Sequence, residues 1–355
     1  MIYVHVPLCR SFCTYCGFYS EIAGDALKNR YVEALTAEIL SSKGADPGPL
    51  HTLYFGGGTP STLDIADFER IFAALREAGF RGPWEECTVE VNPEDIVTRG
   101  PAYVEALMAL GVNRFSVGIQ SLDDGILRWM NRRHDAARGL RALEILRGCG
   151  VGNLSADLIF GIAGLPDAVW EDSVRRLVEA AHPEHISAYQ LSLEEGSALV
   201  EGNYREAPEE LCRGQYDRLC ALMRSYGYEH YEISNFALPG FRAVHNAGYW
   251  KRIPYLGFGG GAHGFDGVKR YWNTCRVSGY RRESENITPE NSKIERIMLS
   301  LRMSDGEEAS FLHRACREEV LAGLISEGAL VERDGRIRIP EDHFFVSDEI
   351  IKELV

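Results

Sequence analysis

The chain has 355 residues, of which 45% are hydrophobic and 25% are charged, and its formal net charge is −14 at pH 7. This length exceeds one modest core and predicts either two domains or a barrel with an appendage. The acidic charge excludes nucleic-acid binding as the main function, because phosphate contacts need clustered Lys and Arg, and no apolar run reaches the length of a membrane span.

The chain opens on a short apolar strand, Ile2–Val6, and not on the basic, apolar and small-residue pattern of a signal peptide. Nine cysteines without such a signal indicate a reducing compartment. We therefore expect a cytoplasmic protein whose thiols bind metals or pack in the core.

Three cysteines directly follow the first strand: Cys9, Cys13 and Cys16 form a C-x3-C-x2-C set. Thiolates are soft ligands, typical of zinc, copper(I) and iron–sulfur clusters. Structural zinc needs four ligands, usually in two pairs, and the chain offers no second C-x2-C or H-x3-H pair. A cubane cluster held by three thiolates, with one iron open to another ligand, explains this loop better than zinc or three unconnected core cysteines.

Six β-rich runs alternate with helical patterns in the first half of the chain. Such an order predicts a parallel sheet with right-handed crossovers. Because six units are fewer than eight, we expect an α/β fold with a partial, open (β/α)6 barrel. The predicted strands are Ile2–Val6, Thr52–Phe55, Thr88–Val91, Arg114–Ile119, Leu154–Phe160 and His185–Leu191.

The second half of the chain changes character. It contains an apolar helical stripe between Cys212 and Met223, a strand at Tyr228–Ile233 and a glycine-rich loop at Leu256–Gly264. From Thr288 two helices precede a hairpin that turns at Asp334-Gly335, and this order resembles a winged helix. We therefore predict a barrel over 1–195, an added α+β segment over 196–287 and a C-terminal winged-helix-like module over 288–355.

Polar groups follow several of the predicted strands at their carboxyl ends, where parallel α/β folds bind ligands. The second strand runs into Gly56–Thr59, the third and fourth end near Glu90 and Gln120, and the fifth carries Asp157. Glycines let the backbone approach a ligand closely, and carboxylates accept from ammonium or ribose hydroxyl groups. Each feature alone is explained by a tight turn or a solvated side chain; together they predict a binding site.

The cysteine spacing resembles the signature of the radical S-adenosylmethionine (SAM) superfamily. The strings YVHVPLC, YFGGGTPSTL, VEVNPED, RFSVGIQSLDD, ADLIFGIAGLP and YLGFGGGAHG resemble its coproporphyrinogen-dehydrogenase-like branch, and within it the HemW family, over nearly the whole chain. The resemblance implies a [4Fe–4S] cluster on Cys9, Cys13 and Cys16, whose open iron binds SAM and whose reduced form cleaves it to a 5′-deoxyadenosyl radical.

The same resemblance implies a SAM site at the predicted rim, with Arg132 aligned only by its distance from Gln120. Its residues are Tyr3, Gly57, Gly58, Thr59, Glu90, Gln120, Arg132 and Asp157.

Two departures separate the chain from the dehydrogenase of this branch. Phe18 stands where that enzyme has a fourth cysteine, and the first strand begins at residue 2, without the enzyme's long preceding segment. HemW proteins are similar to this chain on both counts. They are regarded as cytosolic or membrane-associated haem chaperones that pass haem to haem-dependent proteins.

The segment His245-Asn246-Ala247-Gly248-Tyr249-Trp250 is similar to the H-N-x-x-Y-W motif of HemW. Imidazole is a common haem ligand, and Tyr249 and Trp250 offer flat apolar area for a macrocycle. The alternative is that His245 is a hydrogen-bonded packing element, as buried polar groups generally are. His5, next to the cysteine loop, and His263 are further candidates, although we expect His5 in the barrel interior.

His134 is predicted to lie on the surface. The six other cysteines are interpreted as core or incidental residues; they are Cys87, Cys149, Cys212, Cys220, Cys275 and Cys316.

Three hypotheses follow. The first is a haem chaperone that binds haem and a SAM-coordinating [4Fe–4S] cluster and delivers haem to client proteins. The second is a radical SAM enzyme acting on a tetrapyrrole, and the third is a non-catalytic scaffold stabilised by its cluster. The sequence leaves open the client, SAM cleavage, the haem axial ligand, a homodimer and a peripheral membrane association.

Overall fold

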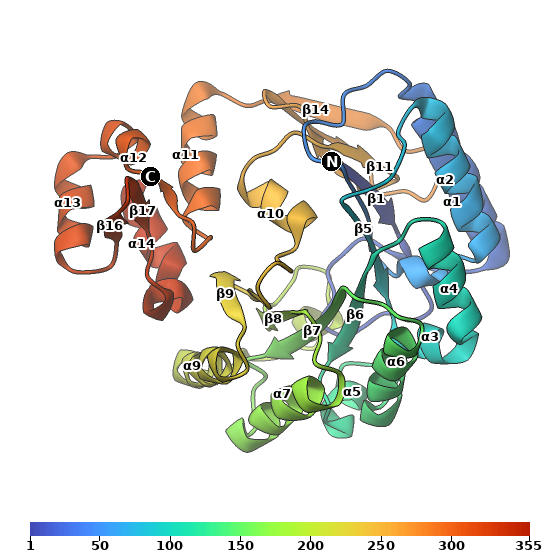
Figure 1. Cartoon of the computed structure of the whole chain (residues 1–355), viewed down its shortest axis with the longest axis horizontal. Helices are drawn as coiled ribbons and strands as arrows, with labels where there is room; N and C mark the ends of the chain where they lie inside the picture. Colours follow the sequence, from blue (N-terminus) through green and yellow to red (C-terminus); the bar gives the residue numbers. More distant parts are fainter.

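The computed structural model describes residues 1–355, and its centre is a nine-stranded sheet in the order β11-β1-β4-β5-β6-β7-β8-β10-β9 (Figure 1). Every pair from β11 to β8 is parallel, whereas β10 is antiparallel to β8 and β9. The strands of this sheet are β1 (Ile2–Val6), β4 (Thr52–Gly57), β5 (Glu86–Val91), β6 (Arg114–Gln120), β7 (Leu154–Phe160), β8 (His185–Gln190), β9 (Glu229–Glu232), β10 (Asn235–Ala237) and β11 (Leu256–Phe258).

All six predicted strands are present, in the predicted parallel arrangement. They are recognisable in the sequence because strands buried on both faces are nearly continuous apolar runs; the five residues of β1, for example, are all buried except Tyr3. The sheet is open, since its terminal strands β11 and β9 pair with different partners.

One sequence prediction at the sheet edge is wrong. Leu256–Phe258 was expected within a glycine-rich loop, but it forms β11 and pairs in parallel with β1. Gly257 makes this possible, because a Cβ there would lie 1.8 Å from the backbone oxygen of His263. Gly257 therefore allows the backbone of β11 to pack closely against the backbone of His263.

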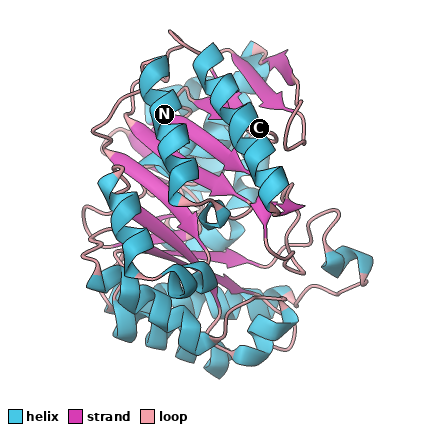
Figure 2. Cartoon of the chain, turned by 90° about the vertical axis from the view of Figure 1, so that its right-hand side faces the viewer, coloured by secondary structure: helices cyan, strands magenta, loops and turns pink.

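Helices cover the outer side of the sheet (Figures 1 and 2). Their apolar stripes face inward, and the predicted stripe from Phe68 to Leu75 is buried. The helices between the strands are α1 (Asp25–Ser41), η1 (Pro60–Thr62), α2 (Ile65–Ala78), α3 (Pro93–Arg99), α4 (Pro101–Ala109), α5 (Asp124–Trp129), α6 (Ala136–Gly148), α7 (Asp167–Ala181), α8 (Ala198–Glu201), α9 (Glu209–Ser225) and α10 (Val244–Trp250).

Helix α10 lies on the inner side of the sheet (Figure 1). Its first backbone N–H groups, at Val244 and His245, donate to the Glu86 carboxylate at 2.7 and 3.1 Å. Since Glu86 is the first residue of β5, α10 lies at the amino ends of the strands. Beyond α10, β12 (His263–Phe265), β13 (Lys269–Asn273) and β14 (Arg282–Asn286) form a separate antiparallel sheet.

The C-terminal part contains helices around a three-stranded sheet, β15-β17-β16. Asp334 and Gly335 have φ of 54° and 73°, as expected for the predicted two-residue hairpin turn. Its elements are α11 (Pro289–Ser300), β15 (Glu307–Glu308), α12 (Ala309–Ala315), α13 (Glu318–Ser326), β16 (Val331–Arg333), β17 (Arg336–Arg338), η2 (Glu341–Val346) and α14 (Ser347–Leu354).

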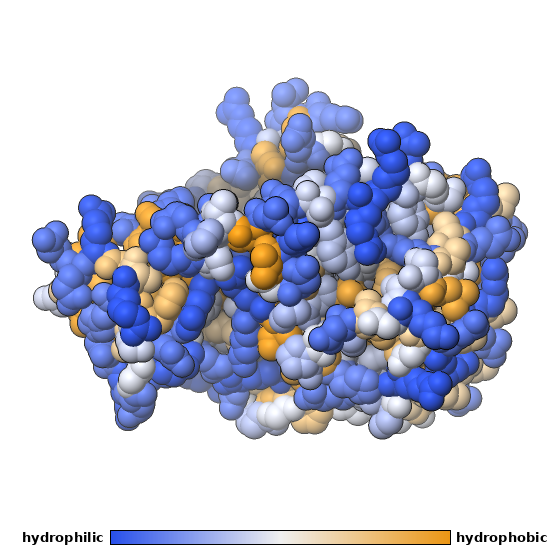
Figure 3. Space-filling model, turned by 90° about the horizontal axis from the view of Figure 1, so that it is seen from above, coloured by the Kyte–Doolittle hydropathy of each residue, from blue (hydrophilic) through white to orange (hydrophobic).

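This C-terminal part joins the rest through both backbone and core. Ile233, next to β9, donates its N–H to the Arg302 carbonyl at 3.2 Å, and Ser304 donates to Tyr231 at 2.9 Å. Buried residues such as Leu312 and Phe344 belong to the same hydrophobic core as the large sheet. The surface in Figure 3 is mostly hydrophilic with scattered hydrophobic spots. None of the helices combines the length and the apolar character that crossing a membrane requires.

Candidate functional site

The loop with the three cysteines is fixed by segments distant in sequence. Thr14 donates its N–H to Met130 O at 3.2 Å, and its own carbonyl accepts the N–H of Leu199 at 3.0 Å. The side chain of Asn131 donates to Phe12 O at 2.7 Å. On the other side, β2 (Leu8–Cys9) pairs with β3 (Glu21–Ile22). The loop is therefore held from both sides.

The three thiols are free and half-buried, and Cys16 lies within range of the charges of Cys13 and Cys9. Burial raises the pKa of Cys16, and the charges of Cys13 and Cys9 raise it further. Arg132 donates from Nη1 to the Cys13 sulfur at 3.4 Å, while the Cys9 sulfur lies 3.4 Å from the Thr59 hydroxyl. Three converging thiols beside a guanidinium that stabilises thiolate charge fit a cluster with three protein ligands.

The glycines after β4 stand against this loop. A Cβ at Gly58 would lie 2.9 Å from the Leu8 carbonyl and 3.0 Å from the Cys9 sulfur. Gly57 has φ of 108°, and a Cβ there would lie 2.6 Å from the ring of His5. Both glycines are thus required by the protein's own packing at the rim, in addition to any approach of a ligand.

Glu90 lies beside these glycines. Its carboxylate accepts from the Tyr54 hydroxyl at 2.7 Å and from the Gly57 N–H at 3.2 Å. Tyr3 is its neighbour, since a Cβ at Gly56 would touch Tyr3, Tyr54 and Glu90 together. Burial raises the pKa of Glu90 from its ordinary value to about 7, so the proton on this carboxyl is exchangeable near neutral pH.

A bulge at the end of β6 brings Gln120 and Arg132 together. The pairing with β7 shifts between Gly118 and Gln120, and Gln120 has φ of 66°, in the left-handed region. A Cβ at Gly118 would lie 2.8 Å from the Gln120 amide nitrogen and 3.2 Å from Arg132 Nη2. Arg132 donates from Nη2 to Gly118 O at 2.7 Å, and its buried Nε has no partner. An unpaired buried donor at this rim is available to a ligand.

Asp157 lies opposite Gly118 on the adjacent strand β7. Its carboxylate accepts from the Ser116 hydroxyl at 3.3 Å, and burial raises its pKa. The residues predicted for the SAM site therefore lie on the neighbouring strands β1 and β4 to β7 or in the segments that follow β4 and α5, at the edge where the cysteine loop is also held.

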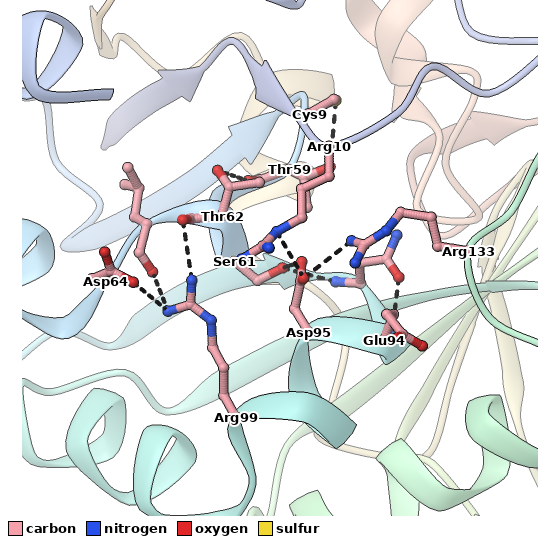
Figure 4. A network of polar contacts seen from close by, with 12 residues as sticks. Cys9, Arg10, Thr59, Ser61, Thr62, Asp64, Glu94, Asp95, Arg99 and Arg133 are labelled. Atoms are coloured by element: carbon pink, nitrogen blue, oxygen red, sulfur yellow. Dashed lines mark hydrogen bonds and ion pairs between the residues drawn. The ribbon is translucent and has the colours of Figure 1, made fainter. Parts of the chain in front are cut away.

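Asp95, which no sequence pattern singled out, organises this edge (Figure 4). Asp95 is 2% exposed and accepts from the Ser61 hydroxyl at 2.8 Å. Its carboxylate also pairs with Arg10 at 3.4 Å and Arg133 at 3.2 Å. The buried Asp95 carboxylate thus connects Arg10, next to Cys9, with Arg133, next to Arg132. The string VEVNPED contains Asp95, but only the fold brings its partners together.

His245 lies away from the cysteines, at the opposite ends of the strands. Its ring nitrogens pair with the hydroxyls of Thr52 and Tyr249, both at 2.8 Å, and its ring stacks on Tyr54 with centroids 5.1 Å apart. Burial lowers the pKa of His245 to about 3, so the imidazole is neutral. In this arrangement His245 has no free nitrogen, which corresponds to the packing alternative raised by the sequence.

The two aromatic residues of the motif, Tyr249 and Trp250, are half-buried. Tyr249 packs edge-on against Tyr255 with centroids 4.7 Å apart. Trp250 lies under the Arg302 guanidinium at 5.2 Å, and its buried indole N–H has no partner. The motif therefore contacts both the inner side of the sheet and the C-terminal part.

Of the remaining histidines, His5 is buried at the rim as expected, with Nδ1 2.9 Å from the Tyr3 hydroxyl. The prediction of a surface position for His134 is wrong. It is 3% exposed, its Nε2 lies 3.2 Å from the Ile119 carbonyl, and burial lowers its pKa to about 3. His263 is exposed on β12 and stacks on Trp272 at 6.3 Å.

Residues 3–177 match the Radical SAM superfamily. The chain is 30% identical to "Heme chaperone HemW" of Lactococcus lactis subsp. lactis (strain IL1403), over 99% of this chain and 96% of the relative. It is 32% identical to the protein of the same name from Synechocystis sp. (strain ATCC 27184 / PCC 6803 / Kazusa), over 92% and 84% of the two chains. The solved structure of coproporphyrinogen III oxidase (HemN) from Escherichia coli has a TM-score of 0.84 at 20% identity, covering 99% of this chain and 88% of that one.

Proposed function

This chain belongs to the HemW family of the radical SAM superfamily, and we propose that it binds haem and a SAM-coordinating [4Fe–4S] cluster and delivers haem to client haem proteins. The observation that carries the proposal is the convergence of Cys9, Cys13 and Cys16 with Arg132 at the edge where Glu90 also lies. That edge provides thiolate ligands, an unpaired guanidinium donor and a carboxylate, in a chain similar to named haem chaperones over nearly its full length.

In the proposed cluster site, Cys9, Cys13 and Cys16 are the protein ligands. When bound, the cluster supplies an open iron for the methionine end of SAM and a source of electrons. Arg132 stabilises the thiolate of Cys13, and Thr59 faces Cys9. Gly58 leaves room for the Cys9 sulfur.

In the proposed SAM site, the Glu90 carboxylate accepts a hydrogen bond from the SAM ammonium group once the carboxyl group has lost its proton. Asp157 accepts hydrogen bonds and Gln120 accepts or donates them on the ribose and adenine side of SAM. Gly57 and Thr59 border the methionine part. Tyr3 and Tyr54 exclude water from the inner face of the carboxylate. The arrangement orients a cofactor, and this is needed for binding whether or not SAM is cleaved.

For haem, the motif residues His245, Tyr249 and Trp250 stay the candidate contacts. Direct ligation by His245 requires that its ring exchange the Tyr249 or the Thr52 hydroxyl for iron. The same proposal includes the domain boundaries after residues 195 and 287. It also includes the description of the first domain as a partial barrel and of residues 288–355 as a winged-helix-like module. A cytoplasmic location and client haem proteins as partners are also part of it.

The test uses one anaerobically reconstituted sample of the full chain. Haem is titrated first, and SAM and reductant are then added for product analysis. We expect haem uptake, transfer of haem to an apo-haem protein and no altered tetrapyrrole. Failure to bind haem in a sample that binds SAM would contradict the chaperone function.

The second candidate is a radical SAM enzyme acting on a tetrapyrrole, such as a coproporphyrinogen III dehydrogenase-like or haem-modifying enzyme. The complete set of rim residues, including Glu90, Gln120 and Asp157, favours it over an inert scaffold. In the same experiment this candidate requires SAM consumption coupled to a changed porphyrinogen or haem.

A further inference from the structure

A second group of metal-binding side chains lies where the C-terminal part meets the large sheet. Cys220 on α9, His230 on β9 and Glu341 on η2 place one ligand atom each within 4.8 Å of the other two. The Cys220 sulfur lies 3.7 Å from His230 Nδ1, and Glu341 Oε1 lies 3.3 Å from the same nitrogen. The three residues come from separate elements, so the fold and not a local motif assembles them.

These spacings match those around a tetrahedral ion. With ordinary zinc bond lengths, a tetrahedron separates a nitrogen from a sulfur ligand by about 3.5 Å and a nitrogen from an oxygen ligand by about 3.3 Å. Cysteine, histidine and glutamate are all zinc ligands, and three protein ligands leave a fourth position for water. The Glu341 side chain is 37% exposed, which gives the ion a route from solvent.

The hydrogen bonds of His230 point to the same conclusion. Its side chain is 4% exposed. The Tyr216 hydroxyl donates to the Ile233 carbonyl at 2.7 Å, so both oxygens near His230 Nε2, at 3.2 and 3.3 Å, must accept from it. The proton thus belongs on Nε2, and Nδ1 directs its lone pair at a carboxylate oxygen and a sulfur. Once the Cys220 thiol loses its proton, three electron-rich atoms face one another, an arrangement that a cation stabilises.

The surroundings complete a metal site. A ligating histidine usually donates its other N–H to an oxygen acceptor, as Nε2 does here. The Arg224 guanidinium donates to Glu341 Oε2 at 2.8 Å and leaves Oε1 directed at the group. Phe236 stacks on the imidazole at 4.1 Å and Phe344 packs edge-on against it at 4.9 Å, which fixes the ring.

We propose that Cys220, His230 and Glu341 bind one Zn²⁺ ion, which fastens the C-terminal part to α9 and β9. On binding, the Cys220 thiol gives its proton to solvent, and the thiolate and the Glu341 carboxylate together neutralise the ion. The site is separate from the three-cysteine loop and does not depend on the proposed haem function.

The experiment uses full-length protein with its iron–sulfur cluster already reconstituted, so that Cys9, Cys13 and Cys16 are not free to take zinc. After mild chelation, the protein is titrated with Zn²⁺ and its metals are measured. We expect about one zinc per chain with unchanged iron. Co²⁺, used as a probe, should give a thiolate-to-metal absorption band.

Cys220→Ser and Glu341→Gln should each weaken zinc binding by at least about tenfold, and Cys220→Ser should abolish the cobalt band. Cys212→Ser, at another buried cysteine of α9, is the matched control and should bind zinc like the parent. Glu341→Gln guards against misfolding, because its side chain is partly exposed. No zinc uptake at micromolar free Zn²⁺, uptake unaffected by both substitutions, or a doubly protonated His230 in zinc-treated protein would overturn the proposal.

Discussion

At the scale of single residues, the cysteine loop is the part of the site with the clearest chemistry. The spacing alone singled out the three cysteines that we propose as ligands, and the structure holds them in one anchored loop. The partners that tune the thiols come from elsewhere: Arg132 from the segment after α5, and Thr59 from the end of β4. No sequence pattern connects these positions, because their proximity arises only when the strands align.

We expect replacement of Cys9, Cys13 and Cys16 by Ala to abolish iron–sulfur absorption, because no other protein ligand is proposed. Cys212→Ala and Cys275→Ala serve as controls at a buried and an exposed cysteine. Iron content and the visible spectrum after anaerobic reconstitution are the measurements. Loss of cluster from either control would contradict the ligand assignment.

The raised pKa of Glu90 predicts pH-dependent SAM binding. Burial raises this pKa from 4.5 to about 7, so the carboxylate that accepts an ammonium group forms as the pH rises through that value. We expect SAM affinity to increase about tenfold between about pH 6 and about pH 8, measured by equilibrium binding to cluster-loaded protein. Glu90→Gln should bind weakly with a flat profile; a parent-like slope in this variant would assign the titration to another group.

The same shift has a consequence for stability with the opposite sign. A carboxyl whose pKa is higher in the folded than in the unfolded chain binds more protons when folded, so its contribution to stability is lost as the pH rises from 4.5 through about 7. Ionised Glu90 thus favours SAM binding in the same pH range in which its burial lowers the stability of the fold. Groups with perturbed pKa values often occur at functional sites.

At the scale of elements, strands and apolar helix stripes were predictable, and connections between them were not. Periodicity identified β1 and β4 to β8, but β11 has three residues with a glycine at its centre and was interpreted as a loop. His134 lies among charged residues in sequence, yet the Ile119 carbonyl at the β6 bulge gives it a buried partner. The left-handed Gln120 likewise follows from the bulge and not from its own preference.

Asp95 links α3 to the cysteine loop, and its removal should loosen that loop. We expect Asp95→Asn to reduce iron retention and to destabilise the fold by about 1 kcal/mol, because Arg10 and Arg133 lose a buried partner but stay accessible to water themselves. Asp64→Asn is the control, since Asp64 also pairs with arginine but is half-exposed and does not contact the loop. Equal iron loss over time in the two variants would remove the positioning role of Asp95.

Helix α10 presents the histidine of the HNxxYW motif to the sheet with both ring nitrogens paired. We expect His245→Ala to lower stability by about 2 kcal/mol, because two buried hydroxyls lose their partner. An unchanged haem spectrum in this variant would assign His245 to packing alone. Denaturant unfolding and the Soret band of haem-loaded protein are compared side by side. A shifted Soret band with weaker haem retention would instead establish that the ring leaves its hydroxyl partners to bind iron.

At the scale of the whole molecule, the C-terminal part shares its core with the sheet although its sequence style differs. Tyr216 of α9 packs on Phe345 at 5.5 Å, and β9 forms an isolated bridge with Met303. The order of helices and a hairpin predicts a C-terminal module from local patterning, whereas the way this module joins the sheet depends on which buried faces meet.

This shared core predicts one cooperative unfolding transition for the full chain. Calorimetry of the cluster-loaded protein should give a single peak, with equal calorimetric and van't Hoff enthalpies. Truncation after residue 287 should leave a chain without a cooperative transition, because it exposes the faces that Phe344 and Phe345 cover. Two separated transitions in the full chain would contradict this coupling.

The position of β1 inside the sheet also determines when the cluster loop can mature. One neighbour of β1, β4, is synthesised soon after it, but the other, β11, follows about 250 residues later. At ordinary elongation rates this interval lasts roughly 12 to 50 s. The partners of Thr14 at Met130 and Leu199 also emerge during it. Until then, the strand that leads into the three cysteines has one unpaired edge and the loop lacks its anchors, so we expect cluster insertion to follow the emergence of residue 258 from the ribosome.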